Sequence, residues 1–206
     1  MESLKQNDFA FIKGQEAAKR AALVSLVGPH SITFYGPSGG GKSMLCEALA
    51  SAGHNRNKYE FRPCPCGNLT DPRKSCMCDK TDIVKHLQGL HTEMATDICV
   101  EVPPIPVSYL FDKQYGTTTT QIVDLAQRAK AVPPIQNPLH AFNNDAQTIM
   151  KQAYSELGLS IHSAVKIASV ADSIRRLSGE LIIGATHVSE AILYRRIDAL
   201  SIVGRK

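Results

Sequence analysis

The sequence of 206 residues predicts an α/β fold in which a small parallel sheet of three strands is followed by a helical region. Three observations support this fold class. A glycine-rich loop over 36–43 lies between a β-prone run and a helix-forming run. Two more short β-prone runs follow, over 58–62 and 97–102. From residue 120 onward, apolar residues recur at helical spacing.

The predicted elements follow one another with short connections. Apolar Phe9, Phe11 and Ile12 precede a helix expected over 15–27, which Gly28-Pro29 ends. Asp145 and Thr186 are the expected N-caps of two later helices. The other expected elements are strands over 31–35, 58–62 and 97–102, and helices over 44–51, 82–90, 120–130, 145–157, 160–177 and 186–200.

The glycine-rich loop matches the phosphate-loop pattern GxxxxGK[ST] at every fixed position. Glycines let consecutive backbone N–H groups turn toward anionic oxygens, and the following helix start adds its positive dipole. Lys42 is expected to reach the β- and γ-phosphates of ATP, and Ser43 to bind Mg²⁺ through its hydroxyl. The alternative is a strand-to-helix turn with no ligand. The residues predicted to bind the nucleotide are Gly36, Pro37, Ser38, Gly39, Gly40, Gly41, Lys42, Ser43 and Met44.

Four of the six cysteines form two close pairs, Cys64 with Cys66 and Cys76 with Cys78. Four thiolates in two pairs can hold a structural Zn²⁺ tetrahedrally, although a two-residue spacer within each pair is commoner than this one-residue spacer. Metal affinity at such a site would add to folding stability. The alternative is a reduced, cysteine-rich loop without a metal.

The composition indicates a folded, mildly basic protein, with 43% hydrophobic residues and a net charge of +4. No apolar run approaches the ~20 residues that a membrane-spanning helix needs, and the first residues lack a signal-peptide core. We therefore expect a cytoplasmic protein with reduced cysteines and no membrane partner. Solvated helix faces explain the basic residues of the C-terminal half most simply, and a nucleic-acid partner is the alternative.

Seven segments carry a resemblance: 8–21, Gly28-Pro29-His30, the phosphate loop with Met44-Leu45, Pro63-Cys64-Pro65-Cys66-Gly67, 100–103, 157–160 and 185–196. Together they resemble the magnesium-chelatase-like AAA+ family of the ComM/YifB type, in the order in which that family has them. The resemblance implies a truncated P-loop nucleotide-binding domain over 1–110, with a Cys-rich insert over 64–78, and a helical lid domain over 111–206. It also implies ATP hydrolysis, a homo-oligomer or a ring with full-length relatives, and DNA processing of the branch-migration type.

The sequence departs from that family pattern at positions that matter for catalysis. The family's N-terminal domain has no counterpart here, and the segment between the loop helix and Cys64 is short. No apolar strand ends in the Asp-Glu pair of a Walker B motif. Arg62 and His162 stand where the resemblance places a sensor asparagine and a sensor arginine, and Met94-Ala95 replaces an Asp-Arg pair.

These departures separate nucleotide binding from hydrolysis. Turnover needs an acid near the metal and usually an arginine for the transition state, whereas the loop suffices for phosphate binding. We therefore expect ATP binding with weak or absent hydrolysis, which leaves open whether the chain is an enzyme. Glu47, Asp71 and Asp97 are candidate replacement acids, and each is also explained as a surface or strand-end residue. The alternatives are an active oligomeric ATPase in DNA processing and a zinc-stabilised binding module with a vestigial loop.

The resemblance also implies a sheet order. Such AAA+ sheets have the order 5-1-4-3-2, and loss of strands 2 and 3 leaves 5-1-4. The strand over 31–35 then lies in the middle, and the strand over 58–62 becomes an exposed edge. Lys58, Glu60 and Arg62 are the kind of charged residues that protect an edge strand from pairing with other chains.

Overall fold

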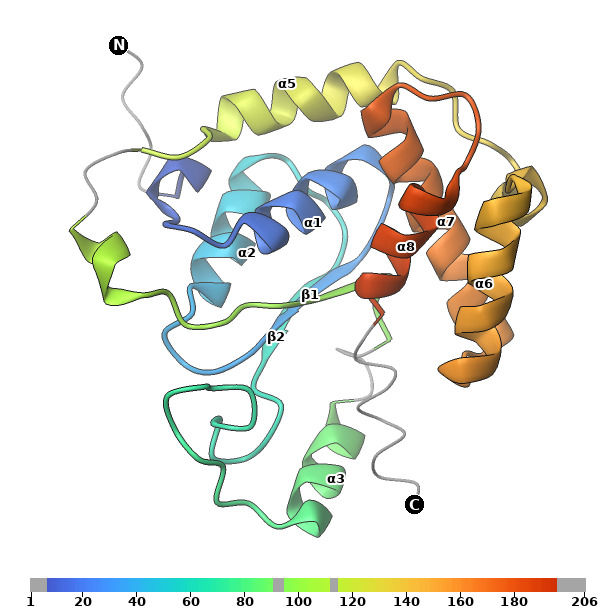
Figure 1. The fold of residues 1–206 in the computed structure, drawn as a ribbon. Helices are drawn as coiled ribbons and strands as arrows, with labels where there is room; N and C mark the ends of the chain where they lie inside the picture. Colours follow the sequence, from blue (N-terminus) through green and yellow to red (C-terminus); the bar gives the residue numbers. More distant parts are fainter. Residues whose placement is uncertain (1–6, 91–94, 112–114, 196–206) are drawn as a thin grey trace.

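A three-stranded parallel sheet lies beneath α1 and α2 and carries the phosphate loop (Figure 1). The computed structural model describes residues 7–90, 95–111 and 115–195. β1 (Ile32–Tyr35) pairs in parallel with β2 (Lys58–Phe61) on one side and with β3 (Ile98–Glu101) on the other. The order β2-β1-β3 confirms both the predicted fold class and the central place of the loop strand.

Helices cover both faces of this sheet. Ile32 and Phe34 of β1 are fully buried against α1 (Glu16–Val27) and α2 (Lys42–Ser51). The alternate side chains face the other way, where Tyr35 stacks on Phe61 and both pack with Leu87 of α3 (Lys80–Gly89). A strand buried on both faces is typical of a parallel sheet, and the apolar and β-branched residues of β1 suit it.

Four longer helices make up the rest of the described fold: α5 (Thr119–Lys130), α6 (Asn144–Glu156), α7 (Ile161–Ser178) and α8 (Ala185–Leu193). α7 packs on α8, α5 and α1, and α6 packs on α8 (Figure 1). Short 3₁₀ turns occur at Phe9–Phe11, Val107–Leu110 and Pro138–Ala141. The division into two domains near residue 110 stays a prediction.

Two predicted caps and one helix end differ from the structure. The side chain of Asn143, in place of Asp145, caps α6 by accepting the N–H of Ala146 at 2.8 Å. Asn143 has the extended backbone of a cap, whereas Asp145 already lies in the first turn. α8 begins after Gly184, so Thr186 lies inside the helix. α8 ends at Leu193, short of residue 200, and the residues from 196 onward lie outside the described part.

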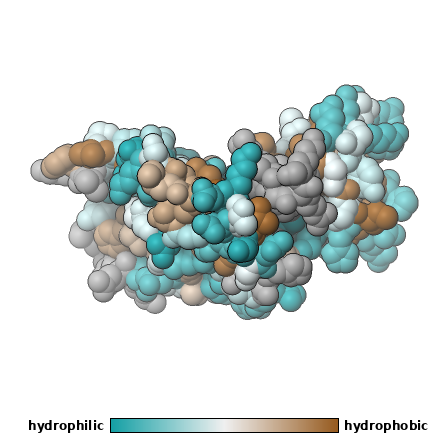
Figure 2. Space-filling model, turned by 90° about the horizontal axis from the view of Figure 1, so that it is seen from below, coloured by the Kyte–Doolittle hydropathy of each residue, from teal (hydrophilic) through white to brown (hydrophobic). Residues whose placement is uncertain are grey.

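Exposed apolar side chains are dispersed over several elements. The face in Figure 2 is largely hydrophilic, with separate hydrophobic patches between the hydrophilic areas. Within the residues that the structure describes, no helix combines the length and apolar character needed to span a bilayer. The most exposed large apolar residues are Met77, Phe111, Leu181 and Ile161.

Candidate functional site

The loop over 36–43 connects β1 directly to α2, as the phosphate-loop motif requires. Gly36, Gly39 and Gly41 have positive φ values of 144°, 81° and 94°. A Cβ atom on Gly36 or Gly40 would lie 2.5 or 2.7 Å from the carbonyl oxygen of Val102, so the chain after β3 packs tightly against the loop. A Cβ atom on Gly39 or Gly41 would meet no atom within 4 Å. The loop is therefore closed toward Val102 and open on the other side.

Lys42 begins α2 and turns its side chain into the loop. Its Nζ donates to the carbonyl oxygens of Pro37 at 2.7 Å and Gly36 at 3.1 Å, and the residue is only 9% exposed. Burial lowers the pKa of Lys42; the charge of Glu60 opposes this shift and that of Arg62 adds to it. An anionic phosphate in the loop would offer this ammonium a charged acceptor, which is a stronger partner than a carbonyl group.

The other residues predicted to bind the nucleotide lie in the same strand–loop–helix unit. Pro37 and Gly40 are buried, whereas Ser38 is exposed at the tip. Ser43 and Met44 follow Lys42 in the first turn of α2, and Met44 is 44% exposed. The structure therefore brings all of the predicted loop residues together, and their contact with a nucleotide stays a prediction.

Gln15 holds the loop from the side of α1. It has a left-handed backbone, with φ of 57°. Its side-chain Nε2 donates to Gly40 O at 2.9 Å and to Pro103 O at 2.6 Å. One amide group thus joins the phosphate loop to the chain that follows β3. Sequence reasoning missed this role, because a glutamine before a helix has no pattern that predicts such distant partners.

Glu60 is the carboxylate that the structure places at the loop. The Oγ of Ser43 lies 2.9 Å from Oε1 and 2.8 Å from Oε2 of Glu60, and donates its proton to this carboxylate. From the sequence alone, Glu60 is expected only to protect an edge strand from pairing with other chains. Its neighbour across the sheet is Phe34 of β1, the strand that leads into the loop. The signal that could have found it was the predicted pairing of 58–62 with 31–35, which sets an acidic residue beside the strand before the loop.

The replacement acids considered from the sequence have other surroundings. Asp71 pairs with Arg73 at 2.9 Å, and this hydrogen bond lowers the pKa of Asp71 to about 2. Asp97 accepts hydrogen bonds from the backbone and hydroxyl of Ser31, each at 2.8 Å. Glu47 is an exposed residue of α2. The hydrogen bonds of Asp71 and Asp97 thus connect them to Arg73 in the same loop and to Ser31 at the start of β1.

Basic residues of the helical region are mostly engaged with backbone carbonyls. Arg175 donates to Glu180 O and Pro133 O, and Arg176 donates to Val132 O, at 2.7–2.9 Å. Arg195 is 7% exposed and donates to Thr96 O. His162, at the expected place of a sensor arginine, is exposed near the start of α7. Arg196 and Met94 lie outside the described residues.

The four paired cysteines converge after β2. The Sγ atoms of Cys64, Cys66, Cys76 and Cys78 all lie within 4.8 Å of one another. Cys66 Sγ is 3.5 Å from Cys64 Sγ and 3.6 Å from Cys76 Sγ, and Cys64 and Cys76 are 3.7 Å apart at their sulfurs. Thiolates about 2.3 Å from a tetrahedral Zn²⁺ would be ~3.8 Å apart. The sulfur positions therefore fit a tetrahedral metal.

Within this cysteine cluster the pKa of Cys66 is lowered, whereas the pKa values of Cys76 and Cys78 are raised. The backbone N–H of Met77, followed by that of Asn68, lowers the pKa of Cys66 to about 6. Cys64 is buried, whereas Cys66 is exposed. α3 lies beside the cluster. Its His86 contacts the backbone there, with Nε2 2.7 Å from the carbonyl oxygen of Arg62, which precedes Pro63 and Cys64. Cys46 and Cys99 lie apart from the cluster, on α2 and β3.

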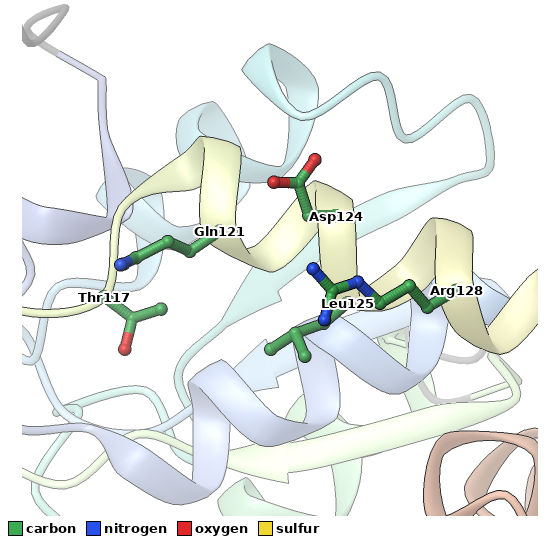
Figure 3. A pocket seen from close by; sticks show the side chains of 5 residues that line it. All are labelled: Thr117, Gln121, Asp124, Leu125 and Arg128. Atoms are coloured by element: carbon green, nitrogen blue, oxygen red, sulfur yellow. The ribbon is translucent and has the colours of Figure 1, made fainter.

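A separate hollow of about 360 Å³ lies beside α5 (Figure 3). Four of its five lining residues belong to α5, the fifth directly precedes the N-cap Thr118, and none belongs to the predicted sites. They are Thr117, Gln121, Asp124, Leu125 and Arg128.

The comparisons agree with the phosphate-loop geometry. Residues 8–60 match the family model of magnesium chelatase, subunit ChlI. This segment is similar to the magnesium-chelatase-like AAA+ family. It runs from the turn before α1, through β1 and the phosphate loop, to Glu60 on β2. No curated protein matches the chain. The ComM type and the missing segments of the family pattern stay predictions.

Proposed function

We propose that this magnesium-chelatase-like protein binds ATP with Mg²⁺ at the loop over 36–43. The observation that carries the proposal is the loop itself. Its side toward Val102 is closed, its side at Gly39 and Gly41 is open, and the ammonium of Lys42 lies within it. Backbone N–H groups, a helix start and one lysine are the parts that bind phosphates in this motif.

We propose further that the chain by itself hydrolyses ATP slowly or not at all. Hydrolysis needs a cation for the charge that develops in the transition state, and a missing arginine finger costs ~10³–10⁵ in rate. Arg175 and Arg176 are held by backbone carbonyls in the helical region. His162 replaces the expected sensor arginine. A carboxylate at the loop, Glu60, supplies only part of this machinery.

The test is ATP binding and turnover by the wild type and by Lys42→Ala. We expect labelled ATP to bind the wild type in the presence of Mg²⁺. The variant should bind more than tenfold more weakly, because the loop loses its charged donor. Lys151→Ala, on an exposed position of α6, is the matched control and should bind as the wild type does.

Phosphate release decides the second half of the proposal. Release at rates typical of enzymes, ~1 s⁻¹ or more, and lost in Lys42→Ala, would show that the isolated chain is an active ATPase. A wild-type protein that fails to bind labelled ATP with Mg²⁺ would exclude the binding proposal.

We propose Zn²⁺ as the occupant of the cysteine cluster, because four thiols converge within 4.8 Å and the sulfurs of Cys64, Cys66 and Cys76 lie 3.5–3.7 Å apart. Elemental analysis of protein purified without chelator should find about one zinc ion per chain. Cys78→Ser should lose it and unfold at a lower temperature, since metal affinity adds to stability. Cys46→Ser, outside the cluster, should keep the zinc. Wild-type protein free of zinc would contradict the assignment.

Assembly into a homo-oligomer or ring, a cytoplasmic location and a DNA partner remain predictions from the resemblance and the composition. The native mass with and without ATP would test the assembly. Retention of the wild-type protein on DNA, compared with a column without DNA, would test the DNA partner.

A further inference from the structure

Glu60 meets Ser43 because two packed elements bring them together. β2 pairs with β1 in parallel register, with Glu60 opposite Phe34. α2 begins immediately after the loop and packs on β2, where Cys46 Sγ lies 4.0 Å from Tyr59 O. The first turn of α2 and the third residue of β2 are therefore held side by side. Residues 17 apart in sequence thereby place a hydroxyl and a carboxylate at the mouth of the phosphate loop.

The oxygen atoms at this point suit a magnesium ion. Mg²⁺ prefers hydroxyl, carboxylate, phosphate and water oxygens in an octahedron, at about 2.0–2.1 Å, so that neighbouring ligand oxygens are ~3.0 Å apart. The oxygens of Ser43 and Glu60 are 2.8–2.9 Å apart. The Ser43 hydroxyl donates its proton to the carboxylate, so the lone pairs of the hydroxyl oxygen remain available to bind a metal ion.

We propose that the Glu60 carboxylate is the acidic partner of Ser43 in holding Mg²⁺, so that the loop takes a nucleoside triphosphate as its magnesium complex. The inference rests on the proposed nucleotide binding and assigns the missing acid to β2. It differs from the sequence expectation, in which an acid was sought at the end of an apolar strand or at Glu47, Asp71 or Asp97.

The charge of Glu60 has opposite consequences with and without the metal. Beside a cradle for phosphates, a bare carboxylate repels the nucleotide, and a carboxylate bound to Mg²⁺ attracts it through the metal. Glu60 therefore makes nucleotide affinity depend on Mg²⁺. This dependence separates a metal-binding residue from one that only stabilises the edge of the sheet.

The experiment measures ATP affinity in excess Mg²⁺ and in EDTA, for the wild type, Glu60→Gln and Glu156→Gln. We expect Mg²⁺ to tighten binding to the wild type. In Glu60→Gln, this tightening should fall by about tenfold or more, while affinity in EDTA stays equal or increases. Glu156→Gln makes the same change at the exposed end of α6 and should behave as the wild type.

A second variant keeps the test independent of the folding of one mutant. Ser43→Ala should lose the same Mg²⁺ effect, and the double variant should lose little more, because both residues serve one ion. Paramagnetic resonance of Mn²⁺ with ATP provides a readout of the metal itself, and it should show weaker retention of Mn²⁺ by both single variants.

The outcomes separate the two proposals. Undiminished tightening by Mg²⁺ in folded Glu60→Gln, or no tightening in a wild type that binds ATP, would overturn the role of Glu60 and leave nucleotide binding intact. A wild type that binds ATP neither with Mg²⁺ nor in EDTA would overturn the proposed function itself.

Discussion

Glu60 and Gln15 show how single residues around the loop acquire roles from distant partners. Glu60 is an exposed edge-strand residue, and its carboxylate accepts the proton of Ser43. Gln15 precedes α1, and its amide links Gly40 to Pro103. In both cases the side chain satisfies a polar group of the loop, and the loop conformation depends on residues outside the motif. Lys42 differs, because its role is already part of the motif.

His30 provides a prediction at this scale, since it is a buried histidine with a neutral partner. Its Nε2 lies 2.7 Å from Ser173 Oγ, and the residue is 3% exposed. Burial lowers the pKa of His30 to about 4; the charges of Arg176 and His54 add to the shift, and those of Asp97 and Asp172 oppose it. The unfolded chain therefore binds a proton near pH 6.5 that the folded chain does not accept until about pH 4.

Above about pH 6.5, His30 is neutral in both states and does not reduce the free energy of unfolding. As the pH falls from about 6.5 toward about 4, the unfolded chain gains the proton first, and the free energy of unfolding decreases. At about pH 5 the loss should be about 2 kcal/mol. His30→Gln cannot gain this proton. Between about pH 7.5 and about pH 5, urea unfolding should therefore show a smaller loss for this variant than for the wild type. His140→Gln, on an exposed turn, is the control. Equal losses in the wild type and His30→Gln would contradict the assignment.

At the scale of elements, the prediction from sequence was most successful where the pattern was local. The periodic apolar residues predicted a helix over 160–177, and α7 runs from Ile161 to Ser178 with Ser160 as its N-cap. The predicted order of the three strands is also confirmed. The end of α8 was not predictable in the same way. Beyond Leu193 the chain meets β3 instead, where Tyr194 O accepts the N–H of Cys99 at 2.8 Å.

A buried ion pair fastens α7 to the connections around it. Arg175 Nε lies 2.8 Å from Asp172 Oδ1, with side chains 3% and 7% exposed. Asp172→Asn should destabilise the protein by about 3 kcal/mol or more, because Arg175 keeps its charge in a buried site without the carboxylate. Urea unfolding measures this change.

The matched control is the ion pair of Arg20 with Glu190, whose side chains are 40% and 26% exposed. Water screens such a pair, so Arg20→Gln should change the free energy of unfolding by about 1 kcal/mol or less. Similar changes in the free energy of unfolding for the two substitutions would show that burial does not increase the contribution of the Asp172–Arg175 pair to stability.

At the scale of the whole molecule, one apolar cluster continues from the sheet into the helical region. It includes Phe34 of β1, Val24 of α1, Ile122 of α5 and Ile174 of α7. Polar contacts follow the same path, since Arg176 Nη1 donates to Val27 O at 3.5 Å and Phe9 N donates to Thr119 Oγ1 at 3.1 Å. The division near residue 110 remains a prediction about how the chain is organised, and the two parts share this cluster.

By itself, the sequence determined the strand–loop–helix unit, the three-strand core and the paired cysteines. The loop unit and the cysteine pairs depend on neighbours within one turn or strand, so spacing and residue type suffice to predict them, whereas the order of the three strands followed from the family resemblance. Only the tertiary structure decided that Glu60 meets Ser43, that Gln15 bridges Gly40 and Pro103, and that four sulfurs converge. These contacts depend on strand register and on the path of connecting loops, which local patterns leave unspecified.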